Sequence, residues 1–157
     1  PQRNPWTDEW LTFFAEHRLG YQLELAARNG YVGELETLGA ALAARLPELL
    51  EGHAPEPSLL HGDLWGGNWG VADGEPVIFD PAVYFGDSET DIAMTQLFGG
   101  FGRTFYEAYF ERRPPGEGSA TRLELYQLYH VLNHLNLFGS GYLGQAITLM
   151  RSLLGDH

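Results

Sequence analysis

Hydrophobic residues recur every three or four positions along most of the first fifty residues, which is the period of an amphipathic helix. The clearest stretch runs from 35 to 49, where a leucine stands at every third or fourth position. A first helix is predicted from about 7 to 17, with Gly20 as a break before a second, shorter helix. Pro47 predicts an end or a kink in the third helix, because its ring removes a backbone donor and crowds the preceding turn.

The middle of the chain has a different pattern. Apolar residues on both sides of Asp73-Gly74 predict a short β-hairpin over 69–80, because this dipeptide favours the tight turns of hairpins. The fold class that we predict is mainly α with a small β-hairpin, and 157 residues suffice for one domain. The chain then returns to the helical period, with helices predicted over 88–98, 101–110, 120–138 and 144–154.

Charge narrows the range of partners. The chain has 21 acidic residues against nine basic ones, all nine are arginine, and the formal net charge is −12. Because this excess of negative charge repels phosphate backbones and anionic lipid, we expect no nucleic-acid partner and no membrane partner. No apolar run reaches 18 residues and there is no cysteine, so no spanning segment, disulfide or thiolate metal site is expected. These features favour a cytoplasmic protein.

The most informative segment is the glycine-rich loop 61–68, His-Gly-Asp-Leu-Trp-Gly-Gly-Asn. Asp63 and Asn68 have the D-x-x-x-x-N spacing of a kinase catalytic loop, in which the aspartate accepts the substrate hydroxyl proton and the asparagine holds Mg²⁺. Asp80 follows the predicted hairpin 69–80, where such sites place a second oxygen ligand for the metal. The loop and the hairpin together predict phosphoryl transfer that uses ATP and Mg²⁺.

Several of these residues also have a purely structural interpretation. Asp and Asn satisfy backbone donors in turns, so Asp63 and Asn68 could be turn residues only. Trp65 could be a core residue beneath the loop instead of a platform for a sugar ring. Asp91 follows Ser88 with the spacing of a capping box. In the kinase interpretation its carboxylate instead accepts hydrogen bonds from backbone amides of the catalytic loop.

Three segments together resemble one known family: His-Gly-Asp-Leu-Trp-Gly-Gly-Asn over 61–68, Phe-Asp-Pro-Ala over 79–82, and Tyr-Phe-Gly-Asp-Ser-Glu-Thr-Asp-Ile-Ala-Met over 84–94. The chain resembles the fructosamine kinase (ketosamine 3-kinase) family, within the wider group of aminoglycoside-phosphotransferase-like kinases. The helical segment 125–139 and the first helices also fit, so the resemblance covers nearly the whole chain. Trp65 and the Asp-Pro-Ala after the hairpin point to the sugar-amine branch of the group.

The resemblance implies transfer of the γ-phosphoryl of ATP to the 3-hydroxyl of a ketoamine, which is a sugar joined to an amine by early glycation. The amine is either a small molecule or a lysine of a glycated protein. Trp65 and His134 are implied to line the substrate pocket, and Glu89 is expected to add negative charge near the amine. Asn133 is a further candidate, although only one of Asn133 and His134 need face inward, because neighbours on a helix point about 100° apart. The residues expected to support the catalytic loop are His61 and Asp91.

Kinases of this group also have an N-terminal lobe with a phosphate-covering loop and a strand lysine. No glycine-rich strand-loop-strand precedes the first predicted helix, and the chain has no lysine. We therefore expect 1–157 to be the helical C-terminal lobe of a protein-kinase-like α+β fold, with the ATP-binding lobe absent and little activity by itself. Two alternatives stay open: a small-molecule hydroxyl kinase for aminoglycosides or choline, and a non-catalytic binding module.

Overall fold

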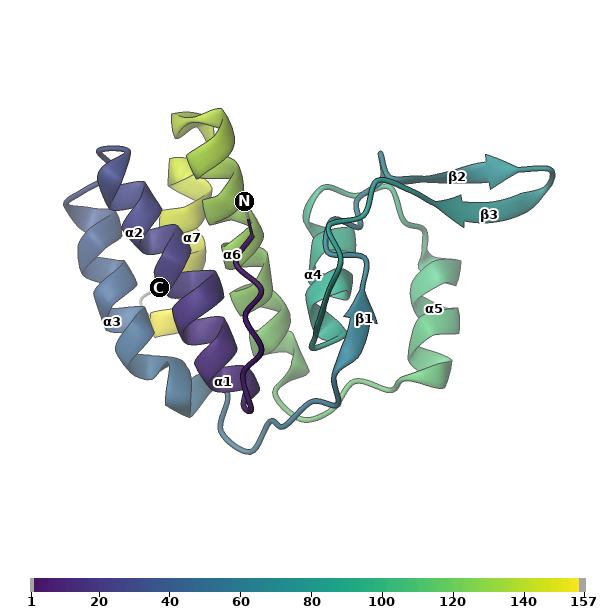
Figure 1. Cartoon of the computed structure of the whole chain (residues 1–157), viewed down its shortest axis with the longest axis horizontal. Helices are drawn as coiled ribbons and strands as arrows, with labels where there is room; N and C mark the ends of the chain where they lie inside the picture. Colours follow the sequence, from purple (N-terminus) through teal and green to yellow (C-terminus); the bar gives the residue numbers. More distant parts are fainter. Residues whose placement is uncertain (1, 156–157) are drawn as a thin grey trace. The chain divides into compact units, whose positions relative to one another are not determined.

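The computed structural model describes residues 2–155, which divide into two compact units. Among these residues, the bundle unit comprises 2–54 and 124–155, and the hairpin unit comprises Pro55–Leu123. Figure 1 shows helices alone in the bundle unit and both helices and strands in the hairpin unit. Within residues 2–155, no helix combines the length and the apolar character needed to cross a membrane. The cytoplasmic location stays a prediction.

The bundle unit is built from helices joined by short turns. The leucines of α3 at 35, 42 and 46 are buried, as their spacing predicts, and α3 packs against α7. Arg45 of α3 donates from Nη1 to the carbonyl oxygen of Leu154 (2.9 Å), which supplies a donor at the carboxyl end of α7. The elements of this unit are α1 (Trp10–Phe13), the π-helix η1 (Phe14–Gly20), α2 (Tyr21–Arg28), α3 (Glu34–Leu49), most of α6 (Ser119–Phe138), the 3₁₀ turn η2 (Ser140–Tyr142) and α7 (Leu143–Leu154).

One predicted break in the bundle unit is wrong. Gly20 does not interrupt the first helix but ends a π-helical stretch, where a Cβ would lie 2.5 Å from the carbonyl oxygen of Ala15. The wider π turn brings that carbonyl close, and glycine leaves room for it. Pro47 lies inside α3, and the hydrogen bond from Leu50 N–H to the Leu46 carbonyl (3.0 Å) shows that the helical pattern resumes after it. Pro47 lacks the N–H that would bond the carbonyl four residues earlier, and the helix ends two residues after it, at Leu49.

The hairpin unit contains the predicted β-hairpin. Strands β2 and β3 pair with Trp69 opposite Ile78, and the loop between them is Asp73-Gly74, with φ of 54° and 83°. Positive φ at both loop residues is the requirement of a type I′ turn, so the local sequence signal is confirmed. The elements of this unit are β1 (Ser58–Leu60), β2 (Trp69–Ala72), β3 (Glu75–Ile78), β4 (Tyr84–Gly86), α4 (Glu89–Leu97), α5 (Arg103–Arg112) and the first turn of α6.

A second two-stranded sheet was not predicted. Strand β4 pairs with β1 in antiparallel register, with Leu60 opposite Tyr84, and both of these side chains are buried. A three-residue strand offers too short a pattern to detect, and its partner is distant in the sequence. The fold is therefore mainly helical with two small sheets, and its assignment as one lobe of a kinase stays a prediction.

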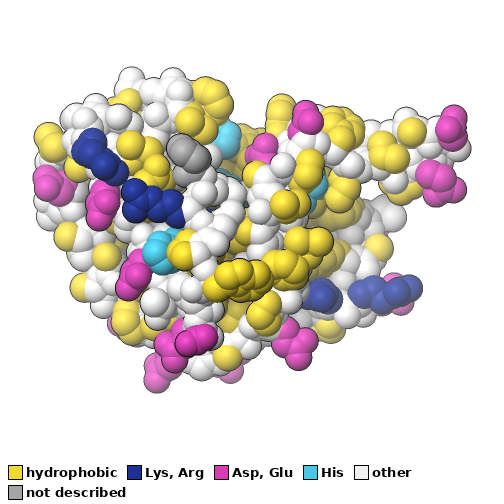
Figure 2. Space-filling model, viewed as in Figure 1, with side chains coloured by type: hydrophobic (Ala, Val, Ile, Leu, Met, Phe, Trp, Pro, Cys, Tyr) yellow, Lys and Arg dark blue, Asp and Glu magenta, His cyan; other side chains and the backbone are white. Residues whose placement is uncertain are grey.

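Apolar side chains are exposed along the β2–β3 hairpin. Val71 and Ile78 are 68% and 62% exposed, respectively. Figure 2 shows hydrophobic side chains along this hairpin and acidic ones at its tip, where Asp73 and Glu75 stand. Because neither face of the hairpin is buried, its conformation depends on its turn and on the loops at its base rather than on a core of its own.

Candidate active site

His61 links the catalytic loop to the segment that follows the hairpin. Its ring is buried, and Nε2 lies 2.9 Å from the carbonyl oxygen of Phe79. A carbonyl only accepts, so Nε2 carries the proton and Nδ1 is left to accept the hydrogen bond from the Asp63 N–H (3.3 Å). The His61 carbonyl in turn accepts from the Ala82 N–H (2.8 Å). This one residue therefore fixes the backbone of Asp63 and both flanks of Asp80-Pro81, consistent with its predicted supporting role.

Asn68 brings the other predicted site residues together. Its Nδ2 donates to the Asp63 carbonyl (2.9 Å) and to Asp63 Oδ2 (3.1 Å), and lies 3.5 Å from the Asp80 carbonyl oxygen. Because all three neighbours are acceptors, they set the orientation of the amide, with Oδ1 on the other side. Asp63, Asn68 and Asp80 thus converge within the hairpin unit, as their spacing predicts.

Oxygen atoms suited to Mg²⁺ are present at this point. Among residues 2–155, no hydrogen bond is made to Asn68 Oδ1 or to the Asp80 carboxylate. Asp80 is exposed and has a φ of 51°, a left-handed conformation that costs an ordinary residue free energy and that clusters at functional sites. One amide oxygen and one carboxylate, with room for water and phosphate oxygens, suit a hard cation that prefers oxygen ligands. The donor set therefore fits the predicted metal.

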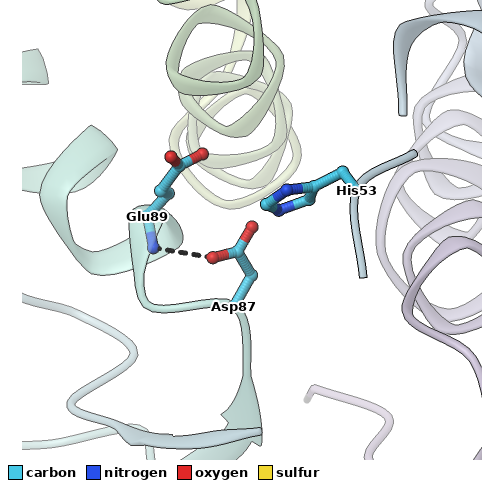
Figure 3. A group of neighbouring side chains, drawn as sticks. All are labelled: His53, Asp87 and Glu89. Atoms are coloured by element: carbon cyan, nitrogen blue, oxygen red, sulfur yellow. Dashed lines mark hydrogen bonds between the residues drawn. The ribbon is translucent and has the colours of Figure 1, made fainter. Parts of the chain in front are cut away.

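Asp91 supports the catalytic loop from α4. Its Oδ2 accepts from the His61 N–H (2.8 Å) and its Oδ1 from the Gly62 N–H (2.9 Å). These are the contacts that the kinase interpretation expects, and the capping-box alternative is wrong, because the Ser88 side chain makes no cap hydrogen bond. The first turn of α4 is instead capped by Asp87, whose Oδ1 accepts from the Glu89 N–H (3.0 Å; Figure 3). The third residue drawn there, His53, belongs to the bundle unit.

We expect Asp91→Asn to lower the free energy of unfolding by about 1–3 kcal/mol, because an amide has one acceptor oxygen for two backbone donors. Asp91→Ala should cost more, since both donors then lose their partner. Urea unfolding measures both changes. The matched control is Asp73→Asn, the same chemical change at an exposed turn position where Asn adopts positive φ readily. Equal stability of the Asp91→Asn and Asp73→Asn variants would contradict the supporting role.

The pH dependence gives a second measurement of Asp91. Burial raises the pKa of this carboxyl above its ordinary value. The hydrogen bonds from the backbone N–H groups of Gly62 and His61 lower the pKa, but their effect is smaller than that of burial. A raised pKa means that the folded state holds the proton more tightly than the unfolded state does. The stability that Asp91 gains from its proton is therefore complete below the unfolded pKa of about 3.9, and it is lost as the pH rises through the folded pKa. The stability difference between the unaltered protein and Asp91→Asn should therefore shrink as the pH rises through this window.

Glu89 has a partner that sequence reasoning missed. Arg122 donates to both of its carboxylate oxygens, from Nε (2.7 Å) and Nη2 (3.0 Å), and both side chains are largely buried. The carboxylate of Glu89 is therefore already paired, and its expected role near the substrate amine stays a prediction. Arg122 also donates to the Glu117 carbonyl (2.7 Å), so the ion pair ties the start of α4 to the segment that leads into α6. No local pattern relates the two members of this pair, because they lie 33 positions apart.

The predicted substrate-contacting residues lie in different units. Trp65 is in the hairpin unit and is 41% exposed, so the interpretation as a core residue is wrong. Asn133 and His134 lie in the bundle unit, where Asn133 accepts from Gln22 (3.2 Å). His134 packs between Phe138 and Tyr142, with ring centroids 5.3 and 5.2 Å away, and its Nδ1 hydrogen-bonds the His130 carbonyl (2.8 Å). A shared pocket of Trp65 and His134 stays a prediction.

The spacing of Asp63 and Asn68, the hydrogen bond between them, and the second aspartate after a hairpin are typical of a kinase catalytic loop. The profile of the family described as fructosamine kinase matches residues 1–156. The chain belongs to the fructosamine kinase family.

Individual relatives agree with this assignment. The chain is 52% identical over 155 residues to a probable ketoamine kinase of Synechocystis sp. and 43% identical over 153 residues to the ketosamine-3-kinase of Mus musculus. Each alignment covers 98% of this chain but only 52% and 50% of the relative, so the chain spans about half the length of these curated relatives. A crystal structure from Thermobifida fusca, of a protein assigned as a fructosamine-3-kinase, superposes with a TM-score of 0.87 at 34% identity, over 99% of this chain and 54% of that one.

Proposed function

We propose that this chain carries the catalytic loop of an ATP-dependent kinase that phosphorylates the 3-hydroxyl of ketoamines, and so takes part in the removal of early glycation products. The observation that carries the proposal is Asn68, which hydrogen-bonds Asp63 and lies next to Asp80. The names of the relatives, ketoamine, ketosamine and protein-ribulosamine kinases, support the substrate class. Substrates are ATP and a sugar-amine, either a small molecule or a glycated protein lysine.

Asp63 is the general base in this proposal. Its Oδ2 accepts from Asn68 (3.1 Å), while Oδ1 has no hydrogen bond from any residue in the range 2–155. That second oxygen is the one that would accept the proton of the sugar hydroxyl as the hydroxyl oxygen attacks the γ-phosphorus of ATP. The backbone of Asp63 is held by His61 through Nδ1, so the carboxylate has a defined direction.

Asn68 and Asp80 are the metal ligands in this proposal, through Oδ1 and the carboxylate. When bound, Mg²⁺ would neutralise charge on the phosphate oxygens of ATP. Asn68 serves the site twice, because its Nδ2 orients Asp63 while its Oδ1 faces away from that contact. Asp80 is held in its left-handed conformation by hydrogen bonds on both flanks, to Phe79 and Ala82.

Trp65 and His134 are the proposed contacts of the sugar. An exposed indole offers an apolar face to the ring carbons, and the histidine offers Nε2 as a polar group. A contact of Glu89 with the substrate amine also stays a prediction, and it would compete with the ion pair to Arg122.

The function is tested by ATP turnover of the protein as its gene encodes it, across ketoamines that carry ribose or fructose on small amines and on protein lysine. We expect turnover with at least one ketoamine and none with the parent sugars and amines. Turnover with aminoglycosides or choline in place of ketoamines would favour the alternative small-molecule kinase. Absence of turnover with every hydroxyl substrate would favour a binding module.

We expect Asp80→Asn to raise the Mg²⁺ concentration for half-maximal activity by about tenfold or more, because the change removes the negative charge from a metal ligand. Asn tolerates the left-handed backbone at this position, so the fold should be retained. A Mg²⁺ titration at saturating ATP measures the shift. Asp73→Asn, at the only other non-glycine residue with positive φ within 2–155, should leave the titration unchanged. An unchanged titration for Asp80→Asn would exclude Asp80 as a ligand.

A further inference from the structure

Two segments of the hairpin unit meet through glycine backbones. A Cβ on Gly100 would lie 2.6 Å from Gly66 Cα, and a Cβ on Gly66 would lie 3.0 Å from Gly100 Cα and 3.1 Å from the Gly99 carbonyl oxygen. The catalytic loop therefore rests directly on the turn 98–102 that follows α4. Trp69 secures the same turn by donating from Nε1 to the Gly100 carbonyl (3.1 Å). Since the neighbours are backbone atoms, a side chain at either position requires the loop itself to move.

Gly67, the next residue in the loop, has a different neighbour. A Cβ there would lie 2.3 Å from Cη2, 2.4 Å from Cζ2 and 2.7 Å from Cζ3 of Trp65. The six-membered ring of the indole thus lies directly on the Gly67 backbone, while the side chain stays 41% exposed. A tryptophan whose indole rests on backbone while the residue stays this exposed has the form of a stacking platform.

We infer that Gly66, Gly67 and Gly100 are positioning residues that hold the Trp65 indole as a rigid platform for the sugar ring of the ketoamine. The inference rests on the proposed function. Gly100 and the turn around it support Gly66 from one side, and Gly67 supports the indole. A platform that is ordered before the substrate arrives loses less side-chain freedom on binding, so the affinity for the sugar depends on these three glycines although none of them reaches the substrate.

The sharpest test is Gly67→Ala, because the atoms it displaces belong to the end of a side chain and the fold can be retained. We expect the KM for the ketoamine to rise about five- to tenfold, as for a lost ring contact, with the KM for ATP changed by less than about twofold. Gly70→Ala is the matched control, three residues along the chain, where a Cβ would meet only Phe79 at 3.7 Å, an ordinary contact distance. The control should leave both constants unchanged.

A double-mutant cycle separates a positioning role from a general packing role. Trp65→Ala should raise the ketoamine KM by about as much as Gly67→Ala, and adding Gly67→Ala to Trp65→Ala should change it little further, because the displaced ring is gone. Additive effects of the two substitutions would overturn the inference. A normal ketoamine KM for Gly67→Ala would also overturn the inference. The proposed function would still stand in that case if the unaltered enzyme phosphorylates ketoamines.

A spectroscopic measurement tests the platform without any turnover. The near-ultraviolet circular dichroism of the unaltered protein minus that of Trp65→Phe is the signal of an ordered Trp65 indole. When both proteins also carry Gly67→Ala, we expect most of this difference to be absent. An undiminished signal would overturn the inference. At the turn, Gly100→Ala should weaken the same signal, whereas Gly99→Ala should retain it. Both glycines have positive φ, 96° and 71°, but only a Cβ on Gly100 meets another atom within 4 Å.

Discussion

Asp63→Asn is expected to lower kcat by about 10²–10⁴-fold, the usual cost of losing a positioned general base. An amide cannot take the proton of the attacking hydroxyl, yet its carbonyl oxygen can still accept the hydrogen bond that Asp63 Oδ2 receives from Asn68. The loop should therefore keep its shape while the chemical step slows. Steady-state kinetics should show KM values for ATP and the ketoamine within about threefold of those of the unaltered enzyme.

The Mg²⁺ titration distinguishes Asp63 from Asp80. Asp63→Asn should leave the Mg²⁺ requirement unchanged, in contrast to Asp80→Asn, because Asp63 acts on the substrate hydroxyl rather than on the metal. Asp73→Asn should show normal kinetics throughout. Near-normal kcat for Asp63→Asn would mean that another group takes the proton, and the assignment of the catalytic loop would have to be abandoned.

Gly62→Ala is expected to produce the largest loss of stability, about 2–4 kcal/mol. Gly62 has a φ of 81°, and a Cβ on it would lie 2.0 Å from the carbonyl oxygen of Ala82. That carbonyl belongs to the backbone segment that His61 ties to the catalytic loop, so it cannot move without breaking the hydrogen bond from Ala82 N–H to the His61 carbonyl (2.8 Å). Thermal or urea unfolding of the protein as its gene encodes it measures the loss.

Gly74→Ala is the matched control for this collision. Gly74 has nearly the same φ, 83°, but a Cβ there would meet nothing within 4 Å. It should cost only the strain of a left-handed alanine, about 1 kcal/mol, so the difference between the two variants measures the close contact with Ala82. Equal losses for Gly62→Ala and Gly74→Ala would show that backbone conformation accounts for the whole effect.

Sequence alone determined the features that depend on neighbours along the chain. The leucine period predicted the buried face of α3, and Asp73-Gly74 predicted the turn between β2 and β3, because both signals concern residues within a few positions of each other. The same holds for Asp63 and Asn68, whose spacing sets them close enough for the hydrogen bond that joins them. The segments carrying these residues also predicted the family.

The tertiary structure decided which side chains hold the site in place. Asp91 was compatible with two partners, a helix terminus or the catalytic loop, and packing of α4 beside His61 and Gly62 selected the loop. Glu89 was expected to place negative charge near the substrate amine, and the fold pairs its carboxylate with Arg122 through two hydrogen bonds. The partners in both cases lie about thirty positions apart, so no local pattern relates them.

The glycines around Trp65 also show which features the sequence determined and which the tertiary structure decided. Sequence placed Gly66 and Gly67 in a loop, as their composition predicts, but gave no reason for glycine at both positions. Only the fold brings the turn at Gly100 against Gly66 and lays the Trp65 indole on Gly67. The space available to a Cβ depends on atoms that arrive from elsewhere in the chain, whereas the tendency to form a turn depends on the residue itself.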